Sequence, residues 1–281
     1  MKSISKPALS LLGVGITSAL AGTQAAFGSN GISAYLSAPR SQASIYTSTT
    51  TETFTGFATG IHTTPLVSAI GTYQLTAASK LAIVADDQYS AGTGNYAALG
   101  AESGSAVPVV LQLTASQAYF GISWNAGDAN NEITFYQGSK LVGYYSTAKT
   151  TGLLSHPTVT TLDGRTYQSS AYNGQPTTLA NAGEPYAFIN FIDTGGTFDK
   201  IVFGNSNNTG TGFESDNHTI RVAAPVPDGS FVYAGIASVP EPGNVGLMIG
   251  FGAGSSVLIF KRRKKRAISV PTIGENSPAH R

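Results

Sequence analysis

The fold of this chain is decided by the stretch Ile133-Thr134-Phe135-Tyr136-Gln137-Gly138-Ser139-Lys140-Leu141-Val142-Gly143-Tyr144-Tyr145. Both of its ends are rich in β-branched and aromatic residues, which suit the pleated surface of a strand. A short polar loop that contains Gly138 joins them, and two β-prone runs joined in this way predict a β-hairpin. Because successive side chains of a strand alternate between two faces, Tyr144 and Tyr145 are expected on opposite faces, with one of them exposed.

Similar short runs recur on both sides of this hairpin, and turns with Gly, Asn, Asp or Ser separate them. No run of twelve or more residues in this region has the spacing of an amphipathic helix. About ten short strands in roughly 210 residues predict one all-β domain, an antiparallel β-sandwich or jelly roll. The expected strands besides the hairpin are Phe54 to Ala58, Thr72 to Ala77, Leu81 to Ala85, Val107 to Leu113, Tyr119 to Trp124, Tyr186 to Ile192, Phe198 to Phe203, Thr219 to Ala223 and Phe231 to Gly235.

Charge is scarce and unevenly distributed. Charged residues make up 11% of the 281 residues, under half of the roughly 25% usual for soluble domains. The formal net charge is +1, but residues 26–239 hold seven Lys and Arg against thirteen Asp and Glu, a formal charge of −6. An acidic domain argues against nucleic-acid binding, and the absence of Cys excludes disulfides, thiol chemistry and Cys-based zinc sites.

Residues 1–25 have the layout of a secretory signal peptide. Lys2 and Lys6 form a basic start, an apolar stretch runs from Ala8 to Leu20, and small residues continue to Ala25. This layout predicts a signal helix and export by the Sec machinery; a buried N-terminal helix is the alternative. Residues 26–53 are expected to be a Ser/Thr-rich exposed leader, and residues 54–238 the sandwich ectodomain.

The C-terminal part predicts a single transmembrane helix. Residues 245–260 form a run of sixteen residues without a charged side chain. A helix of that length rises about 24 Å, short of the roughly 30 Å hydrocarbon core, so the span is marginal. Six adjacent cations follow this run, and they argue against a buried core helix because they cannot be buried together. Such a cluster marks the cytoplasmic side of a transmembrane span. The acidic region is therefore expected outside the membrane, and residues 267–281 are expected to be a cytoplasmic tail. The cations are Lys261, Arg262, Arg263, Lys264, Lys265 and Arg266.

Three glycines recur every fourth residue in this span: Gly246, Gly250 and Gly254. The spacing puts them on one helix face, where another helix can approach closely. The face either docks onto a membrane enzyme or belongs to a Gly-rich span without a specific partner.

Residues 239–266 combine Val239, Pro240, Glu241 and Pro242 with the apolar span and the basic cluster, in this order. They resemble the PEP-CTERM sorting signal of exosortase-dependent bacterial surface proteins, also described as an ice-binding protein C-terminal domain. The resemblance implies that a membrane-embedded exosortase recognises this motif, removes the anchor nearby and releases or attaches the mature protein outside the inner membrane. The tail of fifteen residues departs from the family, whose members commonly stop soon after the cations.

Residues 105–222 resemble a family of exosortase-dependent surface proteins whose domains look like the β-sandwiches of carbohydrate-binding modules. The resemblance lies in segments such as Tyr119 to Trp124, Tyr186 to Phe191 and Gly212 to Asn217. Alternation places Trp124, the only Trp, on the same face as Phe120 and Ile122, so we expect it in the core.

Carboxylates are the candidate chemistry, because HExxH, GxSxG and P-loop motifs are absent. Asp86-Asp87, Asp128 and the group of Glu214, Asp216 and Asn217 are expected at strand ends or in loops. Calcium takes six to eight oxygen ligands. Glu214, Asp216 and Asn217 are candidate calcium ligands, because alternate residues of an extended segment project to one side. Solvated turn carboxylates are the alternative.

Together these features predict an exported, exosortase-processed surface or extracellular-matrix protein. It is anchored in the inner membrane as a precursor, and its mature form lies at the cell surface or is secreted. Its sandwich is expected to be non-catalytic, with extracellular polysaccharide as the candidate ligand for glycan binding or adhesion. The alternative is a secreted glycoside hydrolase, which uses two carboxylates about 5–10 Å apart in a cleft.

Overall fold

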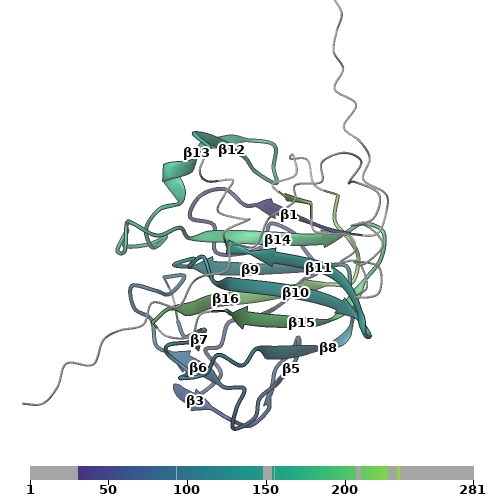
Figure 1. The fold of residues 1–281 in the computed structure, drawn as a ribbon. Helices are drawn as coiled ribbons and strands as arrows, with labels where there is room; N and C mark the ends of the chain where they lie inside the picture. The colour runs from purple at the N-terminus through teal and green to yellow at the C-terminus, as the bar shows by residue number, and fades with distance from the viewer. Residues whose placement is uncertain are drawn as a thin grey trace, which may run out of the picture. The chain divides into compact units, whose positions relative to one another are not determined.

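The computed structural model describes residues 31–92, 94–147, 154, 156–206 and 210–226, and the backbone of residues 233–234. This part of the chain is all-β and antiparallel, with one short 3-10 helix, η2 (Ser169–Tyr172) (Figure 1). Within it, no helix is long and apolar enough to cross a membrane. The expected signal peptide, the sorting motif with its glycine face and basic cluster, and the tail 267–281 lie outside the described residues and stay predictions.

The described strands form two large sheets and one separate hairpin. The larger sheet has the order β17-β1-β14-β9-β16-β7-β6-β3, and β2 pairs with β16. Its strands are β1 (Ile32–Leu36), β2 (Thr50–Glu52), β3 (Gly60–His62), β6 (Leu81–Val84), β7 (Tyr96–Gly100), β9 (Tyr119–Asn125), β14 (Ala187–Asp193), β16 (Gly212–Arg221) and β17 (Tyr233–Ala234). The smaller sheet has the order β11-β10-β15-β8-β5-β4. Its strands are β4 (Leu66–Val67), β5 (Gly71–Gln74), β8 (Val109–Gln117), β10 (Asn131–Gln137), β11 (Lys140–Ser146) and β15 (Phe198–Asn205), and the separate hairpin is β12 (Thr158–Thr160) with β13 (Thr166–Gln168).

The hairpin predicted from residues 133–145 is confirmed. β10 pairs with β11 through a turn in which Gly138 has φ 59°, a left-handed conformation that favours glycine. The register shifts by one residue between Phe135 and Tyr136. Tyr145 is buried and Tyr144 is partly exposed, as the alternation required.

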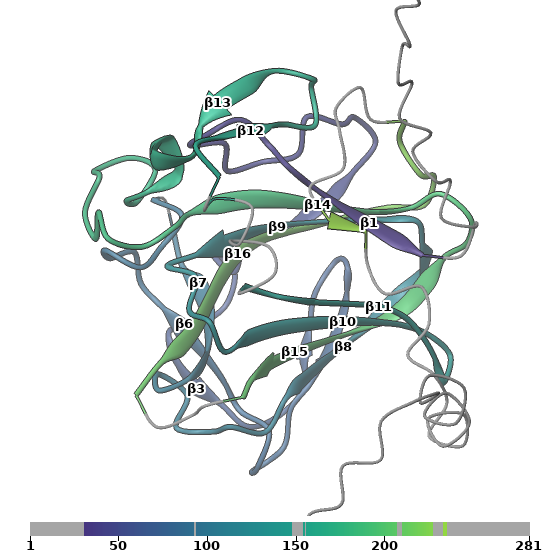
Figure 2. The same ribbon diagram turned by 45° about the horizontal axis from the view of Figure 1, so that its top comes forward.

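The two large sheets form separate layers and pack through their inner faces (Figure 2). The contact is largely aromatic: the ring of Phe135 in β10 lies 6.0 Å from that of Phe120 in β9 and 5.0 Å from that of Phe191 in β14. Trp124 is 3% exposed and stacks on Phe213 at 4.8 Å, so its predicted place in the core is confirmed. Aromatic side chains bury large apolar areas, and this layer stabilises the arrangement of the sheets.

Three sequence predictions need correction. The sandwich begins before residue 54, because β1 lies within the expected leader and its alternate residues Ile32, Ala34 and Leu36 are fully buried. Phe54 to Ala58 is a turn in which Phe54 has φ 56° and donates its backbone N–H to the carboxylate of Glu52. β16 begins at Gly212, seven residues before the expected strand. Its first half carries polar residues that are buried, so it lacks the apolar and polar alternation by which a strand is predicted.

Replacing Phe135 by Ala tests the packing of the layers. We expect Phe135→Ala to lower the free energy of unfolding by about 3–5 kcal/mol, because it removes a ring with several aromatic neighbours. Thr134→Ala, one residue earlier on the outward face, should change it by less than about 1 kcal/mol. Urea denaturation of the two variants measures the difference. Equal losses would contradict the assigned faces.

Candidate functional site

The outer face of the smaller sheet is open to solvent, and two cross-strand rows of side chains line it. One row runs through Tyr136, Lys200, Gln112 and Thr72, which are successive partners in β10, β15, β8 and β5. All four are partly or fully exposed, in contrast to their inward neighbours. We call this surface the open face; its second row consists of Tyr144, Thr134, Val202 and Val110.

Two tyrosines stand in adjacent rows of the open face, each beside a charged group. The ammonium of Lys200 lies 4.5 Å from the centre of the Tyr136 ring, a cation–π distance. Burial raises the pKa of Tyr144 to about 12, and the hydrogen bond with the Glu132 carboxylate and its charge add to the effect. The surface therefore combines two aromatic rings with hydrogen-bonding donors and acceptors.

The outer face of the larger sheet carries polar side chains that are buried instead of exposed. Hydrogen bonds join two nearby chain segments: Gln175 donates to the carbonyl of Asp87 at 3.0 Å, and the hydroxyl of Tyr186 donates to the carbonyl of Gln88 at 2.6 Å. We call this surface the covered face. Beneath the cover lie polar residues that are at most 4% exposed: Ser123, Asn125, Asn190, Glu214 and Asp216. These polar side chains are therefore shielded from solvent in the described conformation.

Glu214 and Asp216 lie in β16 on this covered face, separated by one residue. The alternative of solvated turn carboxylates is wrong for both, because they are 4% and 1% exposed. Burial raises the pKa of Asp216 to about 8, and the charges of Glu52 and Asp86 add to the effect. Burial and the nearby carboxyl of Glu102 likewise raise the pKa of Glu214.

The predicted set of three calcium ligands is not brought together. Asp216 accepts a hydrogen bond from the backbone N–H of Asn217 at 2.6 Å, and Asn217 is the bulged residue, with φ 52°. The acidic neighbours of Glu214 are Glu102 and Asp128, whereas those of Asp216 are Glu52 and Asp86. Within the described ranges, no three His, Asp or Glu side chains are close enough together to hold a metal ion.

Glu102 and Glu214 form a carboxyl pair that sequence reasoning missed. A Cβ placed on Gly212 would lie 1.9 Å from Oε1 of Glu214 and 2.3 Å from Oε2 of Glu102, so both oxygens converge on the bare backbone of this glycine. Oε2 of Glu102 is buried and has no hydrogen-bond donor among the described residues. Glu102 follows β7 in a loop more than a hundred positions from Glu214, and no local pattern predicts such a contact.

His218 is a buried base inside the core. Its Nδ1 is hydrogen-bonded to the hydroxyl of Tyr73 at 2.9 Å and its Nε2 to Oγ of Ser215 at 3.0 Å, while the ring stacks on Phe203. Burial lowers the pKa of His218 to about 3, so its imidazole is neutral at physiological pH.

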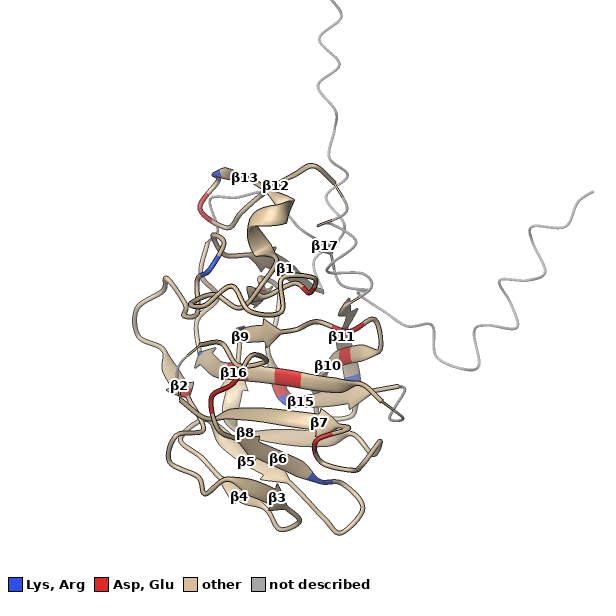
Figure 3. Cartoon of the chain, turned by 90° about the vertical axis from the view of Figure 1, so that its left-hand side faces the viewer, with Lys and Arg blue, Asp and Glu red and all other residues tan. Residues whose placement is uncertain are grey.

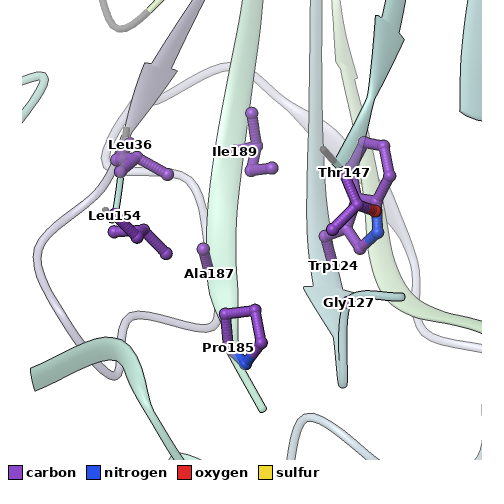
Figure 4. Close-up of a pocket in the computed structure, with 8 residues that line it drawn as sticks. All are labelled: Leu36, Trp124, Gly127, Thr147, Leu154, Pro185, Ala187 and Ile189. Atoms are coloured by element: carbon purple, nitrogen blue, oxygen red, sulfur yellow. The ribbon is translucent and has the colours of Figure 1, made fainter. Parts of the chain in front are cut away.

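One apolar pocket lies at an end of the sandwich, between Leu36, Trp124 and Ile189 (Figure 4). Its volume is about 10 Å³, room for at most one water molecule. A sugar ring does not fit, so this pocket does not qualify as a ligand site.

Acidic residues outnumber basic ones by twelve to six in the part of the chain that the structure describes (Figure 3). The one ion pair found there joins Arg165 and Asp163 at 3.6 Å, and both side chains are substantially exposed. The buried carboxyls of β16 therefore have no basic partner among these residues.

Comparisons of the chain with protein-family models, with curated proteins and with solved structures give no match. The geometry of the described residues is therefore the basis for the functional argument.

The buried imidazole of His218 makes the free energy of unfolding depend on pH. Because the pKa of His218 is about 3 when folded and about 6.5 when unfolded, its contribution is complete above pH 6.5 and is lost as the pH falls toward 3. Relative to His218→Gln, the wild type should lose about 1.4 kcal/mol of unfolding free energy per pH unit between pH 6 and 4. Urea denaturation across this range measures it. His62→Gln is the matched control and should follow the wild type; parallel curves for all three proteins would contradict the neutral buried state.

Proposed function

We propose that this chain is an exported, exosortase-processed surface or extracellular-matrix protein whose sandwich, of the jelly-roll type, binds polysaccharide through the open face. The observation that carries the binding proposal is the placement of Tyr136 and Tyr144 in adjacent rows of an uncovered sheet. Aromatic rings present apolar faces to the C–H groups of sugars, and nearby polar groups fix orientation by hydrogen bonds.

The polar neighbours of the two rings supply both kinds of hydrogen-bonding group. Lys200 and Gln112 carry donors, and Glu132 carries acceptors. The backbone carbonyl of Asp199 accepts from Gln112 at 2.9 Å, and its carboxylate accepts from the backbone N–H of Gly138 at 2.9 Å. These contacts tie the hairpin turn to β15, so the surface is held rigid and little order has to be gained on binding.

The hydrolase alternative draws less support from the arrangement of acidic side chains. Retaining glycosidases place their carboxyls about 5–5.5 Å apart with the substrate between them, and inverting enzymes place them farther apart. The Glu102 and Glu214 oxygens instead meet beside Gly212, and Glu214 is 4% exposed, so a glycosidic bond has no access to both.

Export and sorting rest on the sequence features at the two ends of the chain. Removal of both ends leaves the acidic region 26–239, whose formal charge of −6 suits a soluble domain outside the membrane.

Tyrosine substitutions test the open face. We expect Tyr136→Ala and Tyr144→Ala each to weaken polysaccharide binding by about tenfold, which corresponds to about 1.4 kcal/mol. A glycan array selects the polysaccharide, and titration calorimetry measures the affinities. Tyr167→Ala, on the β12–β13 hairpin, removes a partly exposed tyrosine from another site and should leave the affinity unchanged. Failure to bind any polysaccharide would favour a purely structural role in the matrix.

Deletion of Pro240, Glu241 and Pro242 tests sorting. In a host with exosortase, the wild-type protein should lose the cations at Lys261 to Arg266, whereas the deletion variant should keep them and stay in the inner membrane. Intact mass and cell fractionation measure both effects. A mature wild-type mass that still includes these cations would rule out the sorting proposal.

A further inference from the structure

The strands of the smaller sheet carry two acidic residues and two lysines, and both acidic side chains have a hydrogen-bond donor within the protein. The carboxylate of Asp199 accepts from the backbone N–H of Gly138, at 2.9 Å through Oδ1 and at 3.1 Å through Oδ2, which directs it at the hairpin turn. The carboxylate of Glu132 accepts from the hydroxyl of Tyr144.

The two lysines are Lys200 in β15 and Lys140 at the first residue of β11. Within the described ranges, the one ion pair joins Arg165 and Asp163, so neither ammonium is paired with a carboxylate there. The ammonium of Lys200 lies 4.5 Å from the centre of the Tyr136 ring. A ring face attracts a cation without offering it a lone pair, so the three N–H donors of Lys200 stay available to an acceptor from outside the protein.

Lys200 is the lysine that lies within the aromatic part of the open face. It is the direct cross-strand partner of Tyr136, and Gln112 is its partner on the other side. Val202 and Val110 add apolar surface in the next row. Because alternate residues of a strand are about 7 Å apart, a sugar ring on these two rows has its edge within reach of the Lys200 ammonium.

The acidic charge of the rest of the domain does not cancel this local positive charge. Exposed charges more than about 8 Å apart are largely screened at physiological ionic strength, and Glu132 stands four residues from Tyr136 along β10, about 13 Å away. Glu214 and Asp216 lie on the covered face, where burial raises their pKa values and favours their neutral forms. A ligand beside Tyr136 therefore meets the positive charge of Lys200.

We propose that the open face selects acidic polysaccharides, with Lys200 bound to a carboxylate of a sugar ring that contacts Tyr136. This inference rests on the proposed polysaccharide binding and adds the chemical class of the ligand. A uronic acid unit has both required parts, because it presents an apolar C–H face to an aromatic ring and carries a carboxylate on the same sugar ring. The ammonium and the carboxylate then form a charge-assisted hydrogen bond, which is stronger than a neutral one.

Polygalacturonate and alginate, each compared with its methyl ester, test the proposal, because esterification removes the negative charge and keeps the sugar rings. In titration calorimetry of the full-length chain at pH 7, we expect the acidic forms to bind about tenfold more tightly than the esters. Lys200→Gln should remove most of this preference, and Lys200→Arg should retain it. Added NaCl should weaken binding of the acidic forms more than binding of the esters.

Arg165→Gln is the matched control. It makes the same change in net charge on the separate β12–β13 hairpin and should keep the wild-type preference for the acidic forms. The inference is overturned if the esters bind as tightly as the acidic forms, or if the Lys200→Gln and Arg165→Gln variants lose the preference equally. In the first case polysaccharide binding itself stands, because the esters still bind. If neither form of either chain binds, this inference fails, and the glycan array then decides separately on the proposed function.

Discussion

The aromatic layer between the two sheets is the constraint on which the rest of this structure depends. Phe120, Phe135 and Phe191 meet across it, and each belongs to a different strand. Because side chains alternate along a strand with a period of two, burying Phe135 forces Tyr136 onto the opposite face. A slip by one residue would expose the rings and bury the polar row, so the core sets the composition of the open face as well.

The covered face of the larger sheet obeys different energetics. Polar groups buried there are costly unless each finds a partner, and the buried acids find few. The raised pKa of Asp216 means that its contribution to stability is present below about pH 4 and is lost as the pH rises through about 8. His218 acts in the opposite sense, because its contribution is lost as the pH falls below 6.5. Together, these two contributions favour an optimum of folding stability at weakly acidic pH.

The sequence predicted those parts of the fold in which local pattern and burial agree. The hairpin of residues 133–145, the inward Trp124 and the opposite faces of Tyr144 and Tyr145 all follow from alternation. β7 and the first half of β16 were not predicted, because strands that are buried on both faces lack the apolar and polar alternation that identifies a half-exposed strand. The contact of Glu102 with Glu214 could not be predicted from the sequence, because it arises only when β7 and β16, which are distant in the chain, pair in the sheet.

The two outer faces are therefore under unequal constraint. Side chains of the open face contact solvent and their row neighbours, so a substitution at Lys200 or Gln112 leaves the aromatic layer undisturbed. On the covered face, buried polar groups depend on one another: Ser123 donates to Oδ1 of Asn125 at 2.8 Å, and Gln175 donates to the carbonyl of Asp87 at 3.0 Å, so one substitution leaves another buried group without a partner. Substitutions on the open face can thus change the chemistry of the surface without loss of the sandwich, whereas substitutions on the covered face cannot.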